Sequence, residues 1–283
     1  MKLFLGFAAY HATRICDDRA RAERVASLLV DDRWPWAPWW AQFWARDEFF
    51  KNTRSRKVVG NKGIAFLTEG ITSPDFRRVT LYRSSQEVDA FSHGDFDTGQ
   101  RIIVRDHENP FNASGGIHGY DLPEGKSVSA WVELMHDMMV ALDVGSATIP
   151  VFRGKVSCLN DYTLNTRVIL SDVDFQPPDY PRENSRAIFW RDKLGGTYVR
   201  HPRWGNYLRR EHIAKIGGLD RIRSEVAPAQ LIELGNLVFI GLTDDPRDAL
   251  TSECERKRSA LEALMAPIVA PAAPNEQPIV FPP

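Results

Sequence analysis

The feature that most constrains the fold is a tryptophan-rich segment, residues 33–50, with the sequence Arg-Trp-Pro-Trp-Ala-Pro-Trp-Trp-Ala-Gln-Phe-Trp-Ala-Arg-Asp-Glu-Phe-Phe. Each buried aromatic ring removes roughly 150–250 Å² from water, so this segment dominates whatever core or interface contains it. Four rings follow the i, i+3, i+4, i+7 spacing of one helix face: Trp36, Trp39, Trp40 and Phe43. The spacing predicts a short helix plugged into the core. The alternative is a ring-rich platform for a partner, because tryptophan is favoured at interface hot spots.

Before this segment, the pattern predicts a strand followed by a helix. Residues 2–9 are mostly apolar, which indicates a buried strand. A helix then begins after an aspartate cap, Asp17 or Asp18, and reaches Val30. Its predicted apolar stripe is Ala22, Val25, Ala26 and Leu29, and its predicted solvent face carries Arg19, Arg21 and Arg24.

After the segment, the chain predicts several short strands and one long helix. The basic run at residues 51–57 predicts a loop or a helix end, and residues 63–68, 77–83 and 101–105 predict strands. The clearest helical periodicity runs from Val128 to Leu142, with Ser127 as the N-cap and Gly145 as the stop.

The second half mixes both element types. Strands are predicted at residues 147–152, 163–170, 186–190 and 197–201. The run Trp204-Gly-Asn-Tyr-Leu208 predicts entry into a short helix that ends at Gly217-Gly218, and another short helix begins at Leu219. Gly235-Asn236 predicts the turn of a hairpin, and Asp245 predicts the N-cap of a last helix with the stripe Leu250, Cys254, Leu261, Leu264 and Met265.

This mixture predicts an α+β fold, with mostly antiparallel sheet and packed helices. We expect a single domain over residues 1–270, with two lobes, 1–145 and 146–270, as an alternative arrangement. Residues 271–283 predict a proline-rich tail.

Charge and cysteine content narrow the function. The formal net charge is -1, so no global basic field exists to neutralise nucleic-acid phosphates. The three cysteines, Cys16, Cys158 and Cys254, lie far apart, which argues against a disulfide framework and favours a reducing compartment such as the cytoplasm. The apolar run from Leu3 to Ala9 is too short to span a membrane. As a minimal signal core it would be an alternative to the first strand.

No stretch carries a clear catalytic motif. Gly125-Lys126-Ser127 resembles the end of a phosphate-binding loop, but position 120 is Tyr where that loop needs glycine. The best metal hypothesis is a loop cluster of imidazoles and carboxylates: His93, Asp95, Asp97, Asp106, His107 and His118. A metal-dependent hydrolase built on these residues is the alternative function. We otherwise expect no metal, no cofactor and no enzyme activity.

The order of features resembles a known family. A strand and an arginine-rich helix come first, and a tryptophan-rich segment then runs into the basic residues 51–57. Trp204-Gly-Asn-Tyr-Leu208, Gly217-Gly218, a hairpin and a closing helix follow. This order resembles the immunity proteins of bacterial polymorphic-toxin and type VI secretion systems, in particular those paired with restriction-endonuclease-fold DNase effectors.

The resemblance implies a protein that binds one secreted nuclease toxin in the producer's cytoplasm and blocks its active site or its assembly. DNases carry a positive groove for DNA, so an inhibitor is expected to present carboxylates to it. The first candidate surface is the acidic loop residues Asp172, Asp174, Asp179 and Glu183, and the second is Asp89, Asp95 and Asp97. The expected partner is therefore a toxin protein, with no direct contact to nucleic acid or membrane.

Overall fold

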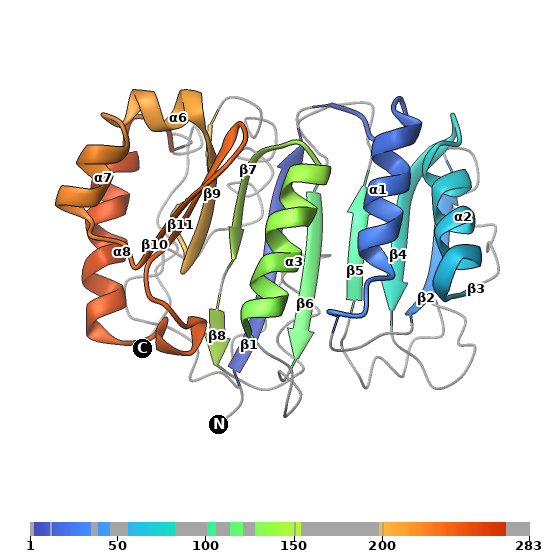
Figure 1. The fold of residues 1–283 in the computed structure, drawn as a ribbon, viewed down its shortest axis with the longest axis horizontal. Helices are drawn as coiled ribbons and strands as arrows, with labels where there is room; N and C mark the ends of the chain where they lie inside the picture. Colours follow the sequence, from blue (N-terminus) through green and yellow to red (C-terminus); the bar gives the residue numbers. More distant parts are fainter. Residues whose placement is uncertain are drawn as a thin grey trace, which may run out of the picture.

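The computed structural model describes residues 3–11, 13–34, 39–45, 56–82, 101–105, 114–120, 128–149, 151–153, 198–199 and 201–269. Within them, strands form one 11-stranded sheet in the order β10-β11-β9-β7-β1-β6-β5-β4-β2-β3, with β8 paired to β1 (Figure 1). The strands are β1 Leu3–His11, β2 Trp39–Ala45, β3 Arg56–Val58, β4 Phe76–Tyr82, β5 Arg101–Arg105, β6 Ser114–Tyr120, β7 Val144–Ile149, β8 Val151–Arg153, β9 Gly205–Arg209, β10 Gln230–Leu234 and β11 Leu237–Gly241. The pairings between these strands are antiparallel, which confirms the predicted α+β class with antiparallel sheet.

Helices pack on this sheet in two groups. The helices are α1 Arg19–Leu29, α2 Gly60–Ile71, α3 Val128–Ala141, α6 Arg210–Lys215, α7 Leu219–Glu225 and α8 Ser252–Met265, with a 3-10 turn at Pro246–Asp248. Figure 1 shows α1, α2 and α3 side by side in front of the sheet, and α6, α7 and α8 together at the end that carries β9, β10 and β11. None of the helices in these described ranges is long and apolar enough to cross a membrane.

The first strand and helix follow the prediction. Asp18 caps α1 by accepting a hydrogen bond from the backbone N–H of Arg21, and the predicted stripe of Ala22, Val25, Ala26 and Leu29 is buried. The placement of Arg21 on a solvent face was wrong. Its Nε donates to the carbonyl oxygen of Ala141 at 3.1 Å, so the guanidinium binds the C-terminal end of α3. A cation at this position is favoured by the negative end of the helix dipole.

The helix predicted in the tryptophan-rich segment is wrong. Trp39–Ala45 is strand β2, which pairs with β3 and β4. Aromatic residues favour strands, and residues an even number of positions apart, such as Ala41 and Phe43, share one face of a strand. Ala41 is buried and Phe43 packs edge-on against Phe66, with 5.4 Å between ring centroids. Arg56 and Lys57 of the basic run belong to strand β3 rather than to a loop or a helix end.

The strand predicted at residues 63–68 is also wrong, because this run belongs to helix α2. A short apolar run cannot be assigned to strand or helix from periodicity alone. In the structure, Gly63, Leu67 and Ile71 form a buried face at i, i+4 and i+8. Glycine is needed at position 63, since a Cβ there would lie 2.9 Å from the carbonyl carbon of Val58.

Helix α3 confirms the predicted helix, but Gly145 is not its stop. The helix ends at Ala141, Asp143 turns the chain with a φ of 46°, and Gly145 lies inside the buried strand β7. The predicted N-cap, Ser127, lies outside the described residues.

The C-terminal elements match the prediction in part. The hairpin β10–β11 forms around Gly235-Asn236 as predicted. Residues 205–209 form strand β9, between β11 and β7, rather than a helix entry, and only then does α6 begin. Asp245 caps the short 3-10 turn, and Thr251 instead caps α8. Of the predicted α8 stripe, Leu250 remains exposed and the other four residues are buried.

Candidate functional site

Most residues predicted to bind a partner or a metal lie outside the described residues. These are Asp89, His93, Asp95, Asp97, Asp106, His107, Asp172, Asp174, Asp179 and Glu183. His118 lies in β6, where it pairs with Gly6 of β1 and with Arg101 of β5. Among the residues that the structure describes, no group of three or more His, Cys, Asp or Glu residues could hold a metal ion.

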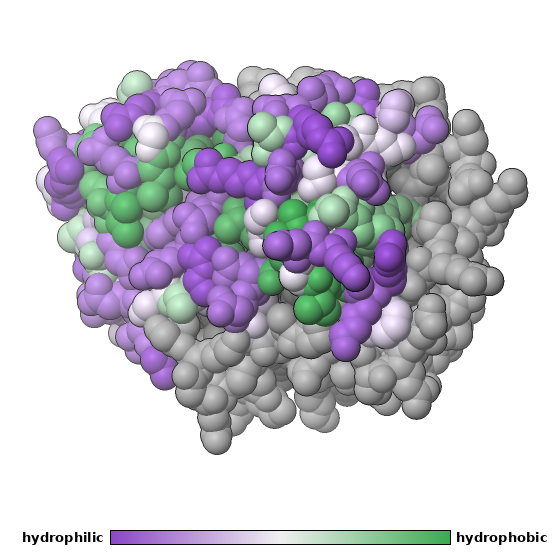
Figure 2. Space-filling model, turned by 45° about the vertical axis from the view of Figure 1, so that its right-hand side comes forward, coloured by the Kyte–Doolittle hydropathy of each residue, from purple (hydrophilic) through white to green (hydrophobic). Residues whose placement is uncertain are grey.

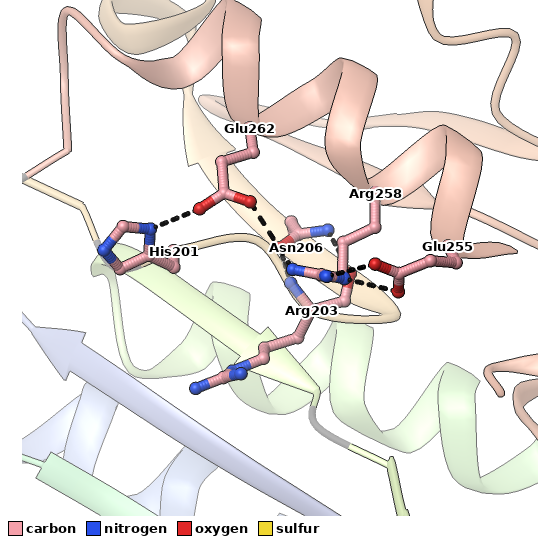
Figure 3. Close-up of polar contacts among 6 residues, drawn as sticks. All are labelled: His201, Arg203, Asn206, Glu255, Arg258 and Glu262. Carbon is pink, nitrogen blue, oxygen red and sulfur yellow. Dashed lines mark hydrogen bonds and ion pairs between the residues drawn. The ribbon is translucent and has the colours of Figure 1, made fainter. Parts of the chain in front are cut away.

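A polar cluster joins α8 to the segment that leads into β9 (Figure 3). Glu255, Arg258 and Glu262 occupy one stripe of α8 at i, i+3 and i+7. The Arg258 guanidinium is buried and lies between the two carboxylates. Its Nε donates to Glu255 at 3.0 Å, and its Nη1 lies 3.5 Å from a carboxylate oxygen of Glu262. The other oxygen of Glu262 lies 2.8 Å from Nδ1 of His201.

The segment before β9 is held by a buried amide. The Asn206 side chain is fully buried, accepts a hydrogen bond from the backbone N–H of Arg203 at 2.8 Å, and donates to the carbonyl oxygen of the same residue at 2.9 Å. These two bonds close a tight loop that fixes the backbone of residues 203–206. Figure 3 shows the side chain of Arg203 extending away from Glu255 and Glu262.

This cluster can hold charged side chains rigidly at the surface. We call it the α8 cluster, and it consists of His201, Arg203, Asn206, Glu255, Arg258 and Glu262. A buried guanidinium is stable only when carboxylates neutralise it, so Arg258 holds both glutamates in place. The side chains of Glu255 and Glu262 are still 38% and 37% exposed. The α8 cluster therefore offers two preorganised carboxylates at the surface, a feature that the sequence showed only as an i, i+3, i+7 pattern of charges.

A second group of polar side chains belongs to the core. The Nδ1 atom of His136, on α3, lies 2.9 Å from the hydroxyl of Tyr207, and its ring packs on Phe239 with 4.6 Å between centroids. Burial lowers the pKa of His136 to about 4 and raises that of Tyr207. Because Tyr207 has no exposed surface, its hydroxyl has no access to a substrate in solution. We assign this pair to the packing between α3 and the sheet.

The cysteine thiol of α8 is likewise a packing group. Cys254 is buried, and burial raises its pKa to about 11. A thiol must be deprotonated to act as a nucleophile. Cys254 therefore remains a neutral thiol at physiological pH.

Comparison with known proteins gives a likeness in fold. No protein-family model matches the sequence, and no curated protein matches it significantly. The structure is similar to that of the Pseudomonas aeruginosa T6SS protein PA0821, with a TM-score of 0.55 over 94% of this chain and 76% of that chain. The two sequences are 12% identical, so the likeness establishes a shared fold.

Proposed function

We propose that this chain is an immunity protein that binds and neutralises a cognate secreted nuclease toxin of a type VI secretion system. The observation that carries the proposal is the likeness in fold, over nearly the whole chain, to a protein named as a T6SS protein. The order of sequence features, which resembles DNase-effector immunity proteins, is a separate line of support. The protein acts by occupying the toxin in the producer's cytoplasm, blocking its active site or its assembly, and it catalyses no reaction itself.

Fixed carboxylates are the chemistry that this role needs. A nuclease binds DNA through a positive groove, and complementary negative charge both steers association and favours the correct partner. The α8 cluster places two partly exposed glutamates on a rigid helix, and the single buried arginine between them offsets only one of their two charges. The acidic residues Asp172, Asp174, Asp179 and Glu183, together with Asp89, Asp95 and Asp97, remain the candidate contacts from the sequence.

The first experiment measures protection. The product of the gene next to the one that encodes this chain, the candidate toxin, is expressed in cells with and without this chain, and survival is counted. We expect survival only when the chain is present. We also expect the purified chain to inhibit the nuclease in a titration that ends at a fixed stoichiometric ratio. Killing that is unchanged by the chain, together with undiminished nuclease activity at molar excess, would refute the proposal.

The second experiment locates the contact. Reversing the charge of Asp172, Asp174, Asp179 and Glu183 to lysine should weaken toxin binding and slow association most strongly at low salt. A control variant reverses Asp220 and Glu225 of α7, which pair with arginines of their own helix, and the losses are compared per reversed charge. Equal losses in both variants would indicate a non-specific charge effect and exclude the acidic loop as the contact.

A further inference from the structure

The two ends of the described sheet differ in how they are protected. An edge strand exposes a row of unpaired N–H and C=O groups that can pair with another chain, and proteins block such pairing with short strands and charged residues. At one end, β3 has three residues, and Arg56 and Lys57 are exposed. At the other end, β10 has five residues with a single charge, Glu233, which is ion-paired with Arg210 at 2.5 Å. The β10 edge is therefore longer than the β3 edge and carries fewer charges.

The turn geometry shows which groups of β10 point outward. Leu234 and Leu237 flank a two-residue turn in which Gly235 has a φ of 64°, as in a type II′ hairpin. These flanking residues form a hydrogen-bonded pair, and such pairs alternate along an antiparallel ladder. Leu231 and Glu233 therefore direct their N–H and C=O groups away from β11.

The side chains on this edge are partly apolar. Ile232 is 37% exposed, whereas every residue of the neighbouring strand β11 is buried. Figure 2 shows hydrophobic residues gathered at the upper left, at the end of the molecule that carries the β10–β11 hairpin and α7 in Figure 1. A second strand along β10 would cover Ile232 as well as satisfy the outward backbone groups.

We propose that β10 pairs antiparallel with β10 of a second copy of this chain, about a twofold axis at Ile232, so that the two sheets become continuous. The strand is complementary to itself in this register. Leu231 forms hydrogen-bonded pairs with Glu233 of the second copy, and the two Ile232 side chains face each other. No like charges stand directly opposite, and each Glu233 keeps its own Arg210. An interface of this length is small, so the dimer is expected to be weak and concentration-dependent.

Cross-linking tests the register directly. Facing residues of a non-hydrogen-bonded pair have Cα atoms about 4.5 Å apart, within the range that a disulfide spans. Ile232→Cys, in a chain with Cys16 and Cys158 replaced by serine, should form a covalent dimer under mild oxidation. Val59→Cys is the matched control, because Val59 is an exposed apolar residue, 56% exposed, near the β3 end of the sheet.

Sedimentation equilibrium of the full chain tests the association itself, from low micromolar to about 1 mM, which spans weak binding. We expect a monomer–dimer equilibrium that Ile232→Lys weakens at least tenfold and Val59→Lys leaves unchanged, with circular dichroism confirming that both variants are folded. A chain that stays monomeric throughout, or an Ile232→Cys variant that cross-links no faster than Val59→Cys, would overturn the proposal. Loss of toxin binding in Ile232→Lys, without any self-association of the wild type, would also overturn it and assign the edge to a strand of the toxin. The dimer does not depend on the proposed function, so toxin neutralisation by a strictly monomeric chain would refute only the dimer.

Discussion

Acidification should destabilise the wild-type chain more than a His136→Asn variant. His136 is packed against Tyr207 and Phe239 and has a pKa of about 4, below its ordinary value of 6.5, because burial disfavours the charged ring. The unfolded chain takes up a proton as the pH falls through 6.5, whereas the folded chain does not until the pH nears 4. The stability that comes from the neutral ring is therefore complete above pH 6.5 and is lost between 6.5 and about 4.

The pKa difference sets the size of the effect. One pKa unit corresponds to about 1.4 kcal/mol, so the full difference would contribute at most roughly 3.4 kcal/mol. His136 is only half-buried and solvent screens part of this, so we expect about 1–2 kcal/mol. Asparagine keeps a polar atom near the Tyr207 hydroxyl and does not titrate. At neutral pH the variant should have a lower free energy of unfolding than the wild type. This difference in unfolding free energy should become smaller by about 1–2 kcal/mol at acid pH.

Urea unfolding followed by tryptophan fluorescence, at about pH 7.5 and about pH 4.5, measures this change from the fitted free energies of unfolding. His212, whose pKa is also lowered chiefly by burial, is present in both chains and cancels in the comparison. If the free energies of wild type and variant decline in parallel from neutral to acid pH, the reasoning about His136 is wrong.

Three further substitutions test the packing around the sheet and the α8 cluster. Gly63→Ala should destabilise the protein by about 1–3 kcal/mol in thermal or urea unfolding. Alanine normally favours a helix, but its Cβ at this position would lie 2.9 Å from the backbone of Val58. An increase in stability would contradict this prediction. Asn206→Ala should cost about 1–3 kcal/mol of unfolding free energy, because backbone groups before β9 lose their partner, and an unchanged urea midpoint would show that water replaces the amide. Thr251→Ala should cost about 1 kcal/mol by removing the N-cap of α8, whereas Ser252→Ala, inside the helix, should change thermal stability little; equal losses would exclude a capping effect.

The sequence predicted elements well where one period was unambiguous. The stripe of α3 and the cap of α1 are fixed by local spacing, and the Gly235-Asn236 turn by the conformational freedom of glycine. The errors arose in segments whose residue spacing fits both the helical period and the strand period. Trp39, Trp40 and Phe43 can be placed on a helix, but pairing with β3 and β4 makes this segment a strand.

Long-range contacts were beyond the reach of sequence patterns. Within its own helix, Arg21 has the spacing of a solvent-exposed charge. Its hydrogen-bond partner, the carbonyl oxygen of Ala141, belongs to α3 and comes close only in the folded chain. The α8 cluster likewise depends on His201, which is remote in sequence from Glu262. The predicted acidic contacts, Asp172 and Asp179 among them, remain predictions.

The central position of β1 in the sheet determines when its strand pairs can form during translation. Phe4 is paired with Tyr120, and Ala8 with Thr148, so β1 finds its neighbours β6 and β7 only after residues 114–149 have been translated. Until then its backbone groups and apolar side chains stay open to other chains, since non-local strand pairing is slow. A premature stop before β6 would leave β1 without its neighbours in the sheet, β6, β7 and β8. This molecule is thus more vulnerable to aggregation during its synthesis than after the sheet has formed.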